Sequence, residues 1–292
     1  DRIGLGVATA AGFDPQGFVS MFEKLQQAAR LNDNGAHPYL RTHPMHSERA
    51  ADLQSRQQLT GRAPAQPTLE HAMVAARARV LANPGVDALR AAVAEADSPS
   101  LGSQPRARQA GLLYGAALAA ARLRDPALSA RLLTRLETLA ADDAAALRLA
   151  RLLAAESTLA QGDTSRALRL VEASSRRRPE LLLSAQAQVQ GGQARDAAQR
   201  LQTWVANNPR DGGAWQVLAN ALAAQGQSVR AVRAEAESRV AQLDYTAALD
   251  RFKAAQDLVR RGTGGGDHIE ASIIDTRARQ VESLLREQAL ER

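Results

Sequence analysis

The stretch from Gly213 to Val232, which reads GAWQVLANALAAQGQSVRAV, decides the fold. Its larger apolar residues recur at spacings of three and four as far as Leu222, which is the period of an amphipathic helix. Gly226 interrupts that pattern with a residue suited to a tight turn, and Ala231 lies in the apolar pattern that follows. The stretch therefore predicts two antiparallel helices joined by a short turn, with the small side chain of Ala231 where the helices approach most closely.

The same arrangement recurs upstream of this stretch. Turn glycines stand 30 and then 34 residues apart, and an alanine follows each of them by five residues: Gly162, Gly192 and Gly226, with Ala167, Ala197 and Ala231. A helix pair of the tetratricopeptide kind occupies about 34 residues. Within the quoted stretch, Trp215, Leu218, Ala219 and Leu222 resemble the first helix of that pattern. The predicted fold class is all-α, a solenoid of stacked helical hairpins.

Further helices are predicted on both sides of these repeats. Less regular pairs are expected at 112–123 with 127–139 and at 69–81 with 86–96. Ala231 and Ala248 are only 17 residues apart, which is half a repeat. We therefore expect the helix from Ser228 to Gln242 to end one pair and begin the next. Residues 269–288 read as the closing helix that an open stack needs. The glycines at 262–266 have no preceding strand and no Gly-Lys-Ser/Thr ending, so they do not form a phosphate loop.

A segment rich in proline and glycine, residues 61–67, is predicted to be a linker between two parts of the chain, 1–60 and 68–292. The chain begins at Asp1 inside an apolar helical pattern, with no initiator methionine and no capping residue before it. We therefore expect it to be a piece of a longer or processed parent.

Three helices are predicted in the N-terminal part. Gly12 is placed to end the first, Asp14 and Pro15 to start the second, and Ser47 to cap the third. The second helix carries an apolar stripe that is expected to face a core: Phe18, Met21, Phe22, Leu25 and Ala29.

The amino-acid composition limits the folds and the kinds of functional site that this chain can have. Aromatic residues are only 3% of the chain, and alanine and leucine dominate the 45% that is hydrophobic, which favours helix over sheet. No window is apolar for long enough to span a membrane. The absence of cysteine excludes disulfides and thiolate sites. The net charge of +6 comes from arginine, because Lys24 and Lys253 are the only lysines.

A basic chain is compatible with acidic partners, including nucleic acid. The basic run from Arg176 to Arg178 lacks neighbouring aromatic residues that would stack on bases, and we expect it at the end of a repeat's second helix, where cations complement the helix dipole. Nucleic acid is therefore not expected as a partner.

Three of the five histidines, His37, His43 and His46, fall within ten residues. Pro44 separates the last two and disfavours the regular helix that would align both rings on a metal. By themselves these histidines read as surface residues. The sequence contains no nucleophile elbow and no His-Glu-x-x-His motif.

Several short motifs of the N-terminal part occur together in a known order: Asp1-Arg2-Ile3-Gly4-Leu5, Gly12-Phe13-Asp14-Pro15, Phe22-Glu23-Lys24-Leu25, Thr42-His43-Pro44 and Ser47-Glu48-Arg49. With them the chain resembles the back half of an M48-type zinc metallopeptidase domain. In particular it resembles the bacterial periplasmic branch, in which the peptidase domain precedes a tetratricopeptide domain and helps to maintain outer-membrane protein assembly.

The resemblance implies a site that this sequence contains only in part. The family binds zinc through His-Glu-x-x-His and a glutamate on a later helix, and an aspartate one turn beyond that glutamate supports the ligands. Asp1 matches this aspartate, so the resemblance implies a supporting role for it. His43 lies in the Thr-His-Pro motif, on a loop near the active-site cleft of this branch, and our hypothesis is that it gates the enzyme by occupying the open zinc position. Zinc is expected in the intact parent and not in this chain alone, which is expected to be inactive.

The resemblance thus predicts part of a periplasmic zinc metalloendopeptidase and chaperone that acts in outer-membrane protein assembly and quality control. Association with the outer membrane is compatible with that role. Its repeats would bind protein clients or the assembly machinery through an arginine-rich groove. The alternative is a non-catalytic adaptor or chaperone, which the absence of His-Glu-x-x-His upstream of Asp1 would favour. A third reading, an RNA-binding repeat protein, predicts a steep salt dependence of oligonucleotide binding.

Overall fold

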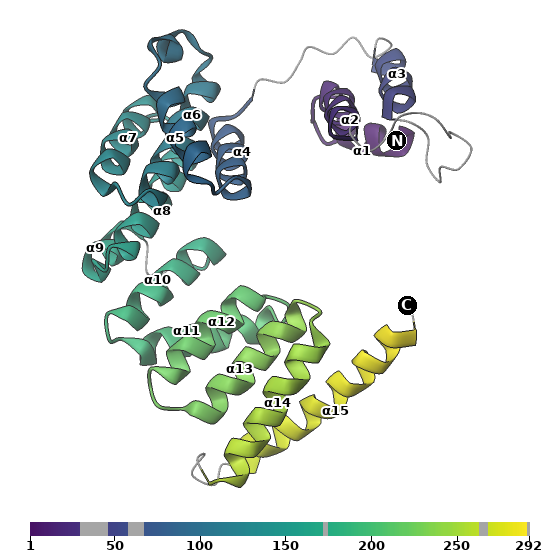
Figure 1. Cartoon of the computed structure of the whole chain (residues 1–292), viewed down its shortest axis with the longest axis vertical. Helices are drawn as coiled ribbons and strands as arrows, with labels where there is room; N and C mark the ends of the chain where they lie inside the picture. Colours follow the sequence, from purple (N-terminus) through teal and green to yellow (C-terminus); the bar gives the residue numbers. More distant parts are fainter. Residues whose placement is uncertain (30–45, 58–66, 172–174, 263–267, 291–292) are drawn as a thin grey trace. The chain divides into compact units, whose positions relative to one another are not determined.

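The computed structural model describes residues 1–29, 46–57, 67–171, 175–262 and 268–290, and every regular element in these ranges is a helix. The helices form two compact units, Asp1–Thr68 and Leu69–Arg292. Figure 1 shows the first unit in purple and blue and the stacked helices of the second from blue to yellow. The predicted all-α, solenoid-like fold class is confirmed.

The first unit contains α1 (Arg2–Ala10), α2 (Gln16–Ala29) and α3 (His46–Gln57). The turn between α1 and α2 has the predicted chemistry. Gly12 adopts a positive φ of 90°, and the Asp14 side chain accepts a hydrogen bond of 2.9 Å from the backbone N–H of Gln16. A small core of Leu5, Val19, Phe22, Ala50 and Leu53 holds the three helices together.

Two predictions about this unit are wrong in detail. Val19 and Phe22 form the buried face of α2, whereas Met21 and Leu25 are each more than 40% exposed. The apolar stripe was therefore placed about one residue off, because α2 carries more apolar residues than its contact with α1 and α3 can cover. Ser47 lies inside the first turn of α3, which begins at His46, so it is not the cap of that helix.

The second unit begins with α4 (Leu69–Ala82) and α5 (Val86–Ala96), followed by a short 3₁₀ helix at Pro99–Ser103. The stack then continues through ten helices in the described ranges: α6 (Arg106–Arg122), α7 (Pro126–Leu139), α8 (Ala144–Ala160), α9 (Thr164–Leu170), α10 (Arg178–Gln190), α11 (Ala194–Asn207), α12 (Gly212–Ala223), α13 (Ser228–Ala241), α14 (Tyr245–Arg260) and α15 (His268–Leu290).

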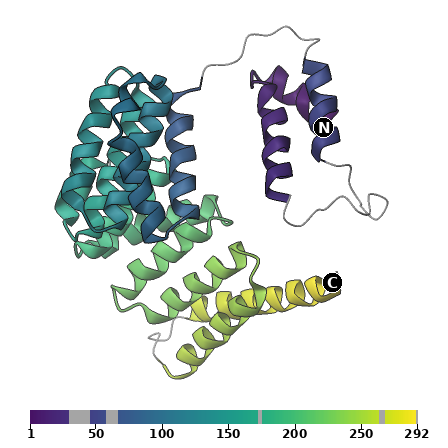
Figure 2. The same ribbon diagram turned by 45° about the horizontal axis from the view of Figure 1, so that its top comes forward.

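From α6 onward each helix packs on the next, and the first helices of successive pairs, α8, α10 and α12, also contact one another. Figure 2 shows the last helices of the stack, in green and yellow, following one another in chain order. Because each pair buries its apolar face against its neighbours, the core runs along the stack rather than filling one centre.

The predicted turn glycines and alanines are confirmed. The three glycines all have positive φ angles, between 73° and 83°, which a residue with a side chain adopts only at a cost. The alanines five residues later are 4% exposed or less, because neighbouring helices approach closely at these points. The glycines are Gly162, Gly192 and Gly226, and the alanines are Ala167, Ala197 and Ala231.

The predicted shared helix is also confirmed. Helix α13 contacts α12, α14 and α15, so it ends one pair and begins the next. Helix α15, which was predicted as the closing helix, buries Ile274, Ala278 and Val281 against this end of the stack.

The helices predicted at 69–81 and 86–96 exist as α4 and α5, but they do not form a pair with each other. Both pack chiefly on α6, which they flank. Helix α6 can pack against both helices because it is buried almost all round from Ala110 to Ala120. In addition, its backbone at Gly111 lies close to the Ala72 carbonyl of α4.

Candidate functional site

In the first unit, the candidate site residue Asp1 is held by an arginine. The Arg49 guanidinium on α3 binds both carboxylate oxygens of Asp1, with Nε 2.6 Å from Oδ2 and Nη2 on Oδ1. Its Cζ atom lies 4.1 Å from the centre of the Phe22 ring. This arrangement joins the start of α1 to α3 across α2, and both charged side chains are only about a quarter exposed. The Asp1 carboxylate is thereby oriented by the fold rather than left to solvent.

We expect Arg49→Ala to loosen α1 from α3. The variant loses a bidentate ion pair and a cation–π contact, together worth about 1–2 kcal/mol at this exposure. Amide hydrogen exchange of α1 and α3 in the full chain should therefore be roughly tenfold faster.

The matched control for this prediction is Arg56→Ala, on the same helix. Arg56 pairs with Asp52 one turn away on the exposed surface of α3. It should change exchange in α1 by less than a factor of about two. Equal effects of the two variants would show that the Asp1 pair does not tie the helices together.

The histidine predictions stay untested. His37 and His43 lie outside the described residues, and for His46 only the backbone is described, as the first residue of α3. Within the described ranges, no group of three or more His, Asp or Glu side chains is placed so that it could hold a metal ion. The described residues therefore do not fit a zinc site of their own.

Among the described residues of the second unit, three glutamates are buried, and each binds an arginine of another helix. Glu180 on α10 binds Arg148 of α8, Glu237 on α13 binds Arg277 of α15, and Glu270 on α15 binds Arg233 of α13. The sequence analysis missed these pairs because their members lie 32 to 40 residues apart. A carboxylate and an arginine recurring at about one repeat length would have been the signal to look for.

The Glu180 carboxylate belongs to a structural ion pair and is not a candidate acid. Burial alone would raise the pKa of Glu180, but hydrogen bonds from Arg148 and from the backbone outweigh it and hold that pKa below its ordinary value. A general acid at neutral pH needs a raised pKa. Glu180 therefore remains ionised, and its charge joins α8 to α10.

The basic run at Arg176 to Arg178 is not at the end of a second helix, so that prediction is wrong. Arg178 is the first residue of α10, and its guanidinium binds both carboxylate oxygens of Asp211, each at 2.7 Å. Asp211 is the N-cap of α12 and also accepts from the indole N–H of Trp204 at 2.9 Å. This cluster joins the N-terminal ends of α10 and α12.

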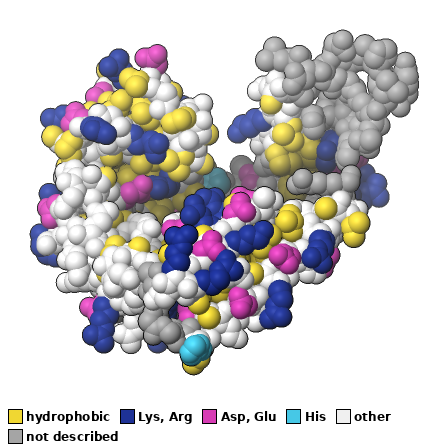
Figure 3. All heavy atoms as spheres, turned by 60° about the horizontal axis from the view of Figure 1, so that its bottom comes forward, with side chains coloured by type: hydrophobic (Ala, Val, Ile, Leu, Met, Phe, Trp, Pro, Cys, Tyr) yellow, Lys and Arg dark blue, Asp and Glu magenta, His cyan; other side chains and the backbone are white. Residues whose placement is uncertain are grey.

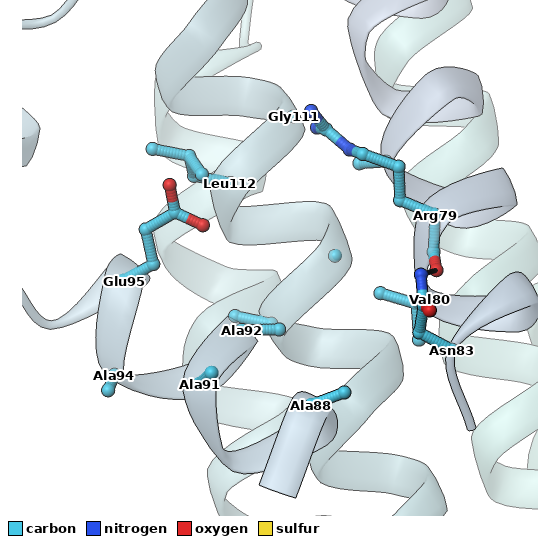
Figure 4. Close-up of a pocket in the computed structure, with 13 residues that line it drawn as sticks. Arg79, Val80, Asn83, Ala88, Ala91, Ala92, Ala94, Glu95, Gly111 and Leu112 are labelled. Carbon is cyan, nitrogen blue, oxygen red and sulfur yellow. Dashed lines mark hydrogen bonds between the residues drawn. The ribbon is translucent and has the colours of Figure 1, made fainter. Parts of the chain in front are cut away.

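A groove of about 640 Å³ lies between α4 and α5, with α6 as its floor. Figure 4 shows Arg79 and Asn83 on the α4 side and Glu95 on the α5 side. Most of the other lining residues are small: Ala76, Ala88, Ala91, Ala92, Ala94, Gly111, Gly115 and Ala116. Glu95 already faces Arg108 at 3.9 Å, and the lining contains no His and no second acid, so the groove is not a catalytic or metal site.

The surface carries both signs of charge. Figure 3 shows basic and acidic side chains interspersed on the face that it displays, with no extended region of a single sign. Among the helices of the described residues, none is both long enough and apolar enough to cross a membrane.

Fold and candidate site together define a helical-repeat protein with a separate three-helix unit whose Asp1 is fixed by an arginine. Comparison with models of known protein families finds no match. Among curated proteins, the chain is similar to the beta-barrel assembly-enhancing proteases of Escherichia coli (strain K12), Escherichia coli O157:H7 and Shigella flexneri.

With each of these three proteins the identity is 31% over an alignment 289 residues long, and the alignment covers 97% of this chain. The chain spans 56% of the length of each. The resemblance predicted from the N-terminal motifs is therefore confirmed: the chain is a homologue of the beta-barrel assembly-enhancing proteases. Because the similarity covers 97% of the chain, it extends into both units.

Proposed function

We propose that this chain is part of a periplasmic zinc metalloendopeptidase and chaperone that acts in the assembly and quality control of outer-membrane β-barrel proteins. The observation that carries the proposal is the similarity, along 97% of the chain, to proteases named for enhancing β-barrel assembly. Since the chain spans about half of their length, the activity belongs to the intact protein rather than to these 292 residues.

In this proposal the first unit supplies the last helices of an M48-type peptidase domain. Asp1 supports a zinc ligand, and Arg49 holds the Asp1 carboxylate in one orientation through its two hydrogen bonds. Zinc would activate the water that attacks the scissile peptide bond. The described residues supply no set of metal ligands, so no step of hydrolysis is assigned to them.

The first experiment compares this chain with the intact protein that contains it. Elemental analysis should give no stoichiometric zinc for the chain alone and one equivalent for the intact protein, which should also cleave an unfolded outer-membrane β-barrel protein. In the intact protein, Arg49→Lys keeps the charge but loses the bidentate geometry, and zinc affinity should fall roughly tenfold or more. Unchanged zinc affinity would rule out the support role of the Asp1–Arg49 pair.

The gating role of His43 is tested separately in the intact protein. If the imidazole occupies the open zinc position, His43→Ala should raise the rate of proteolysis and lower zinc affinity, because one ligand is lost and the catalytic water gains access. The matched control is His37→Ala, which removes a neighbouring imidazole that lies outside the Thr-His-Pro motif. A change in neither quantity would leave the loop without a gating role.

The alternative is a non-catalytic adaptor or chaperone, in which the first unit serves only for packing. It predicts that the intact protein lacks His-Glu-x-x-His and binds unfolded β-barrel proteins without cleaving them. The two proposals share the repeat unit as the holder of clients, and they separate on zinc content and on proteolysis.

A further inference from the structure

The groove between α4 and α5 is lined mostly by carbon atoms. Its α5 wall consists chiefly of the methyl groups of Ala88, Ala91 and Ala92, its α4 wall includes Val80, and its floor is α6. The N–H and C=O groups within a helix are already bonded to one another, so these surfaces offer few hydrogen-bonding partners to an occupant. The volume of about 640 Å³ therefore suits a largely apolar body.

One charged group of the groove has no partner. Among the described residues, the Arg79 guanidinium takes part in no ion pair and no hydrogen bond. Glu95 is the other charged residue of the lining, and it faces Arg108 at 3.9 Å. The charges of that pair offset each other. The uncompensated charge of the groove is therefore the single positive charge of Arg79.

The charged groups gather at one end of the groove. Three residues, Asn83 to Gly85, join α4 to α5 and close the other end. Figure 4 shows Ala88 and Asn83 towards the closed end, whereas the guanidinium of Arg79 and the carboxylate of Glu95 lie towards the open end, on opposite walls. The Asn83 amide is already bonded to the Arg79 carbonyl oxygen at 3.2 Å. An occupant with an apolar tail and one negative group thus has a place for each part.

We propose that this groove binds a fatty acid, with the alkyl chain between α4 and α5 and the carboxylate on Arg79. The planar fork of a guanidinium matches the two oxygens of a carboxylate. A phosphate monoester carries nearly two negative charges at neutral pH, which one guanidinium does not balance. The wall from Ala88 to Glu95 runs for about 10 Å along α5, so the groove holds a single chain of medium length.

A polypeptide fits this groove less well. An extended segment would bury its N–H and C=O groups against alanine methyl groups, and each unpaired group costs free energy. A helix satisfies its own backbone, but its axis needs about 8–10 Å to each neighbouring axis. Since Cα atoms of α4 and α5 approach within 8 Å of each other, no helix can lie between them along the whole groove. An alkyl chain is thinner and needs no hydrogen bond.

Binding is measured with the full chain by isothermal titration calorimetry, with every amphiphile kept below its micelle concentration. Decanoate should bind at a single site. Decyltrimethylammonium has the same chain length and the opposite charge, and it should bind at least about tenfold more weakly. From hexanoate to decanoate the affinity should rise about two- to fourfold for each methylene group. It should level off for longer chains, because the groove is only about 10 Å long.

Two variants locate the site. Arg79→Gln should weaken decanoate binding about fivefold or more and abolish the preference over decyltrimethylammonium. Its control is Arg90→Gln, at an exposed arginine of α5 outside the lining. Ala91→Leu fills the groove and should weaken binding of both amphiphiles about tenfold. Its control is Ala78→Leu, at an exposed alanine of α4 outside the lining. Since all four side chains are exposed, thermal unfolding of the variants should match that of the unaltered chain.

Several outcomes would overturn the inference. Decanoate might show no saturable binding, decyltrimethylammonium could bind as tightly, or Ala91→Leu could bind decanoate as well as Ala78→Leu does. A helical peptide of leucine, alanine and glutamate that binds more tightly than decanoate, and that Ala91→Leu blocks, would identify a partner helix instead. Dimerisation in sedimentation velocity that Ala91→Leu abolishes would identify a second copy. None of these readouts depends on zinc or proteolysis, so the proposed function is tested separately.

Discussion

Replacing Gly111 by leucine is expected to destabilise the repeat unit by about 3 kcal/mol or more. Gly111 lies in the buried helix α6, and a Cβ atom at this position would come within 2.9 Å of the Ala72 carbonyl oxygen of α4. That contact is with backbone, so the two helices have to separate to relieve it. Equilibrium unfolding in urea, followed by circular dichroism, should show the loss as a lower midpoint.

Gly115, one turn along the same face of α6, provides the control. A Cβ atom there would meet the Ala76 Cβ at 3.4 Å, which is ordinary contact. Gly115→Ala should therefore be neutral or stabilise the unit by up to about 1 kcal/mol, because glycine is the poorer helix former. If leucine at 111 and alanine at 115 had equal effects, the close approach of α4 and α6 would not limit the packing.

Asp211→Ala is expected to cost roughly 2–4 kcal/mol. The Asp211 carboxylate caps α12 through the Ala214 N–H at 3.1 Å and also accepts from Arg178 and Trp204, while its own side chain is only 9% exposed. The substitution removes the cap and leaves the Trp204 N–H without its acceptor. Tryptophan fluorescence reports the loss directly, because the chain has two tryptophans and Trp204 touches the site.

The variant Asp244→Ala measures the contribution of an N-cap to stability without that of an ion pair. Asp244 caps α14 by accepting from the Ala247 N–H at 3.2 Å, and it takes no part in an ion pair among the described residues. Its loss should cost about 1 kcal/mol. If Asp211→Ala cost no more than Asp244→Ala, then Arg178 and Trp204 would contribute nothing to the link between α10 and α12.

The same site predicts a pH dependence. Hydrogen bonds from Arg178, with smaller contributions from Trp204 and the Ala214 N–H, lower the pKa of Asp211 from 3.8 to about 2 against the opposing effect of burial. The folded state thus holds the proton less tightly than the unfolded state, so the contribution is complete above about pH 4 and is lost as the pH falls towards 2.

Allowing for the half-exposed Arg178 side chain, that loss is about 2 kcal/mol at most. Urea midpoints measured between pH 5 and 2 should fall more steeply for the unaltered chain than for Asp211→Asn, which has no charge to titrate at this position. Parallel curves for the two proteins would contradict the assignment.

Local sequence patterns were sufficient to predict the helices and turns themselves. Gly162, Gly192 and Gly226 were predicted as turns because only a residue without a side chain adopts a positive φ freely. The helix from Ser228 was predicted to be shared because too few residues separate its neighbours for two helices. Both inferences depend on spacing along the chain, which the sequence contains directly.

The faces of the helices were predicted less well. Met21 and Leu25 fit a helical stripe as well as Phe22 does, and the periodicity could not tell which of them the small three-helix unit would bury. Helices α4 and α5 were expected to pair because they are consecutive, but glycine at position 111 lets α4 approach α6 more closely than it approaches α5. Such choices depend on competition between packing partners far apart in the sequence.

The candidate site, like the fold, was predictable from the sequence only in part. The sequence by itself determined an all-helical repeat chain and, through its N-terminal motifs, the resemblance that the homologues confirmed, because helix periodicity, turn residues and short motifs are local. Only the tertiary structure decided that Arg49 holds Asp1 and that Asp211 joins α10 to α12. Those arrangements arise when residues 30 to 50 positions apart are brought into contact, and no local spacing records which of several arginines meets which carboxylate.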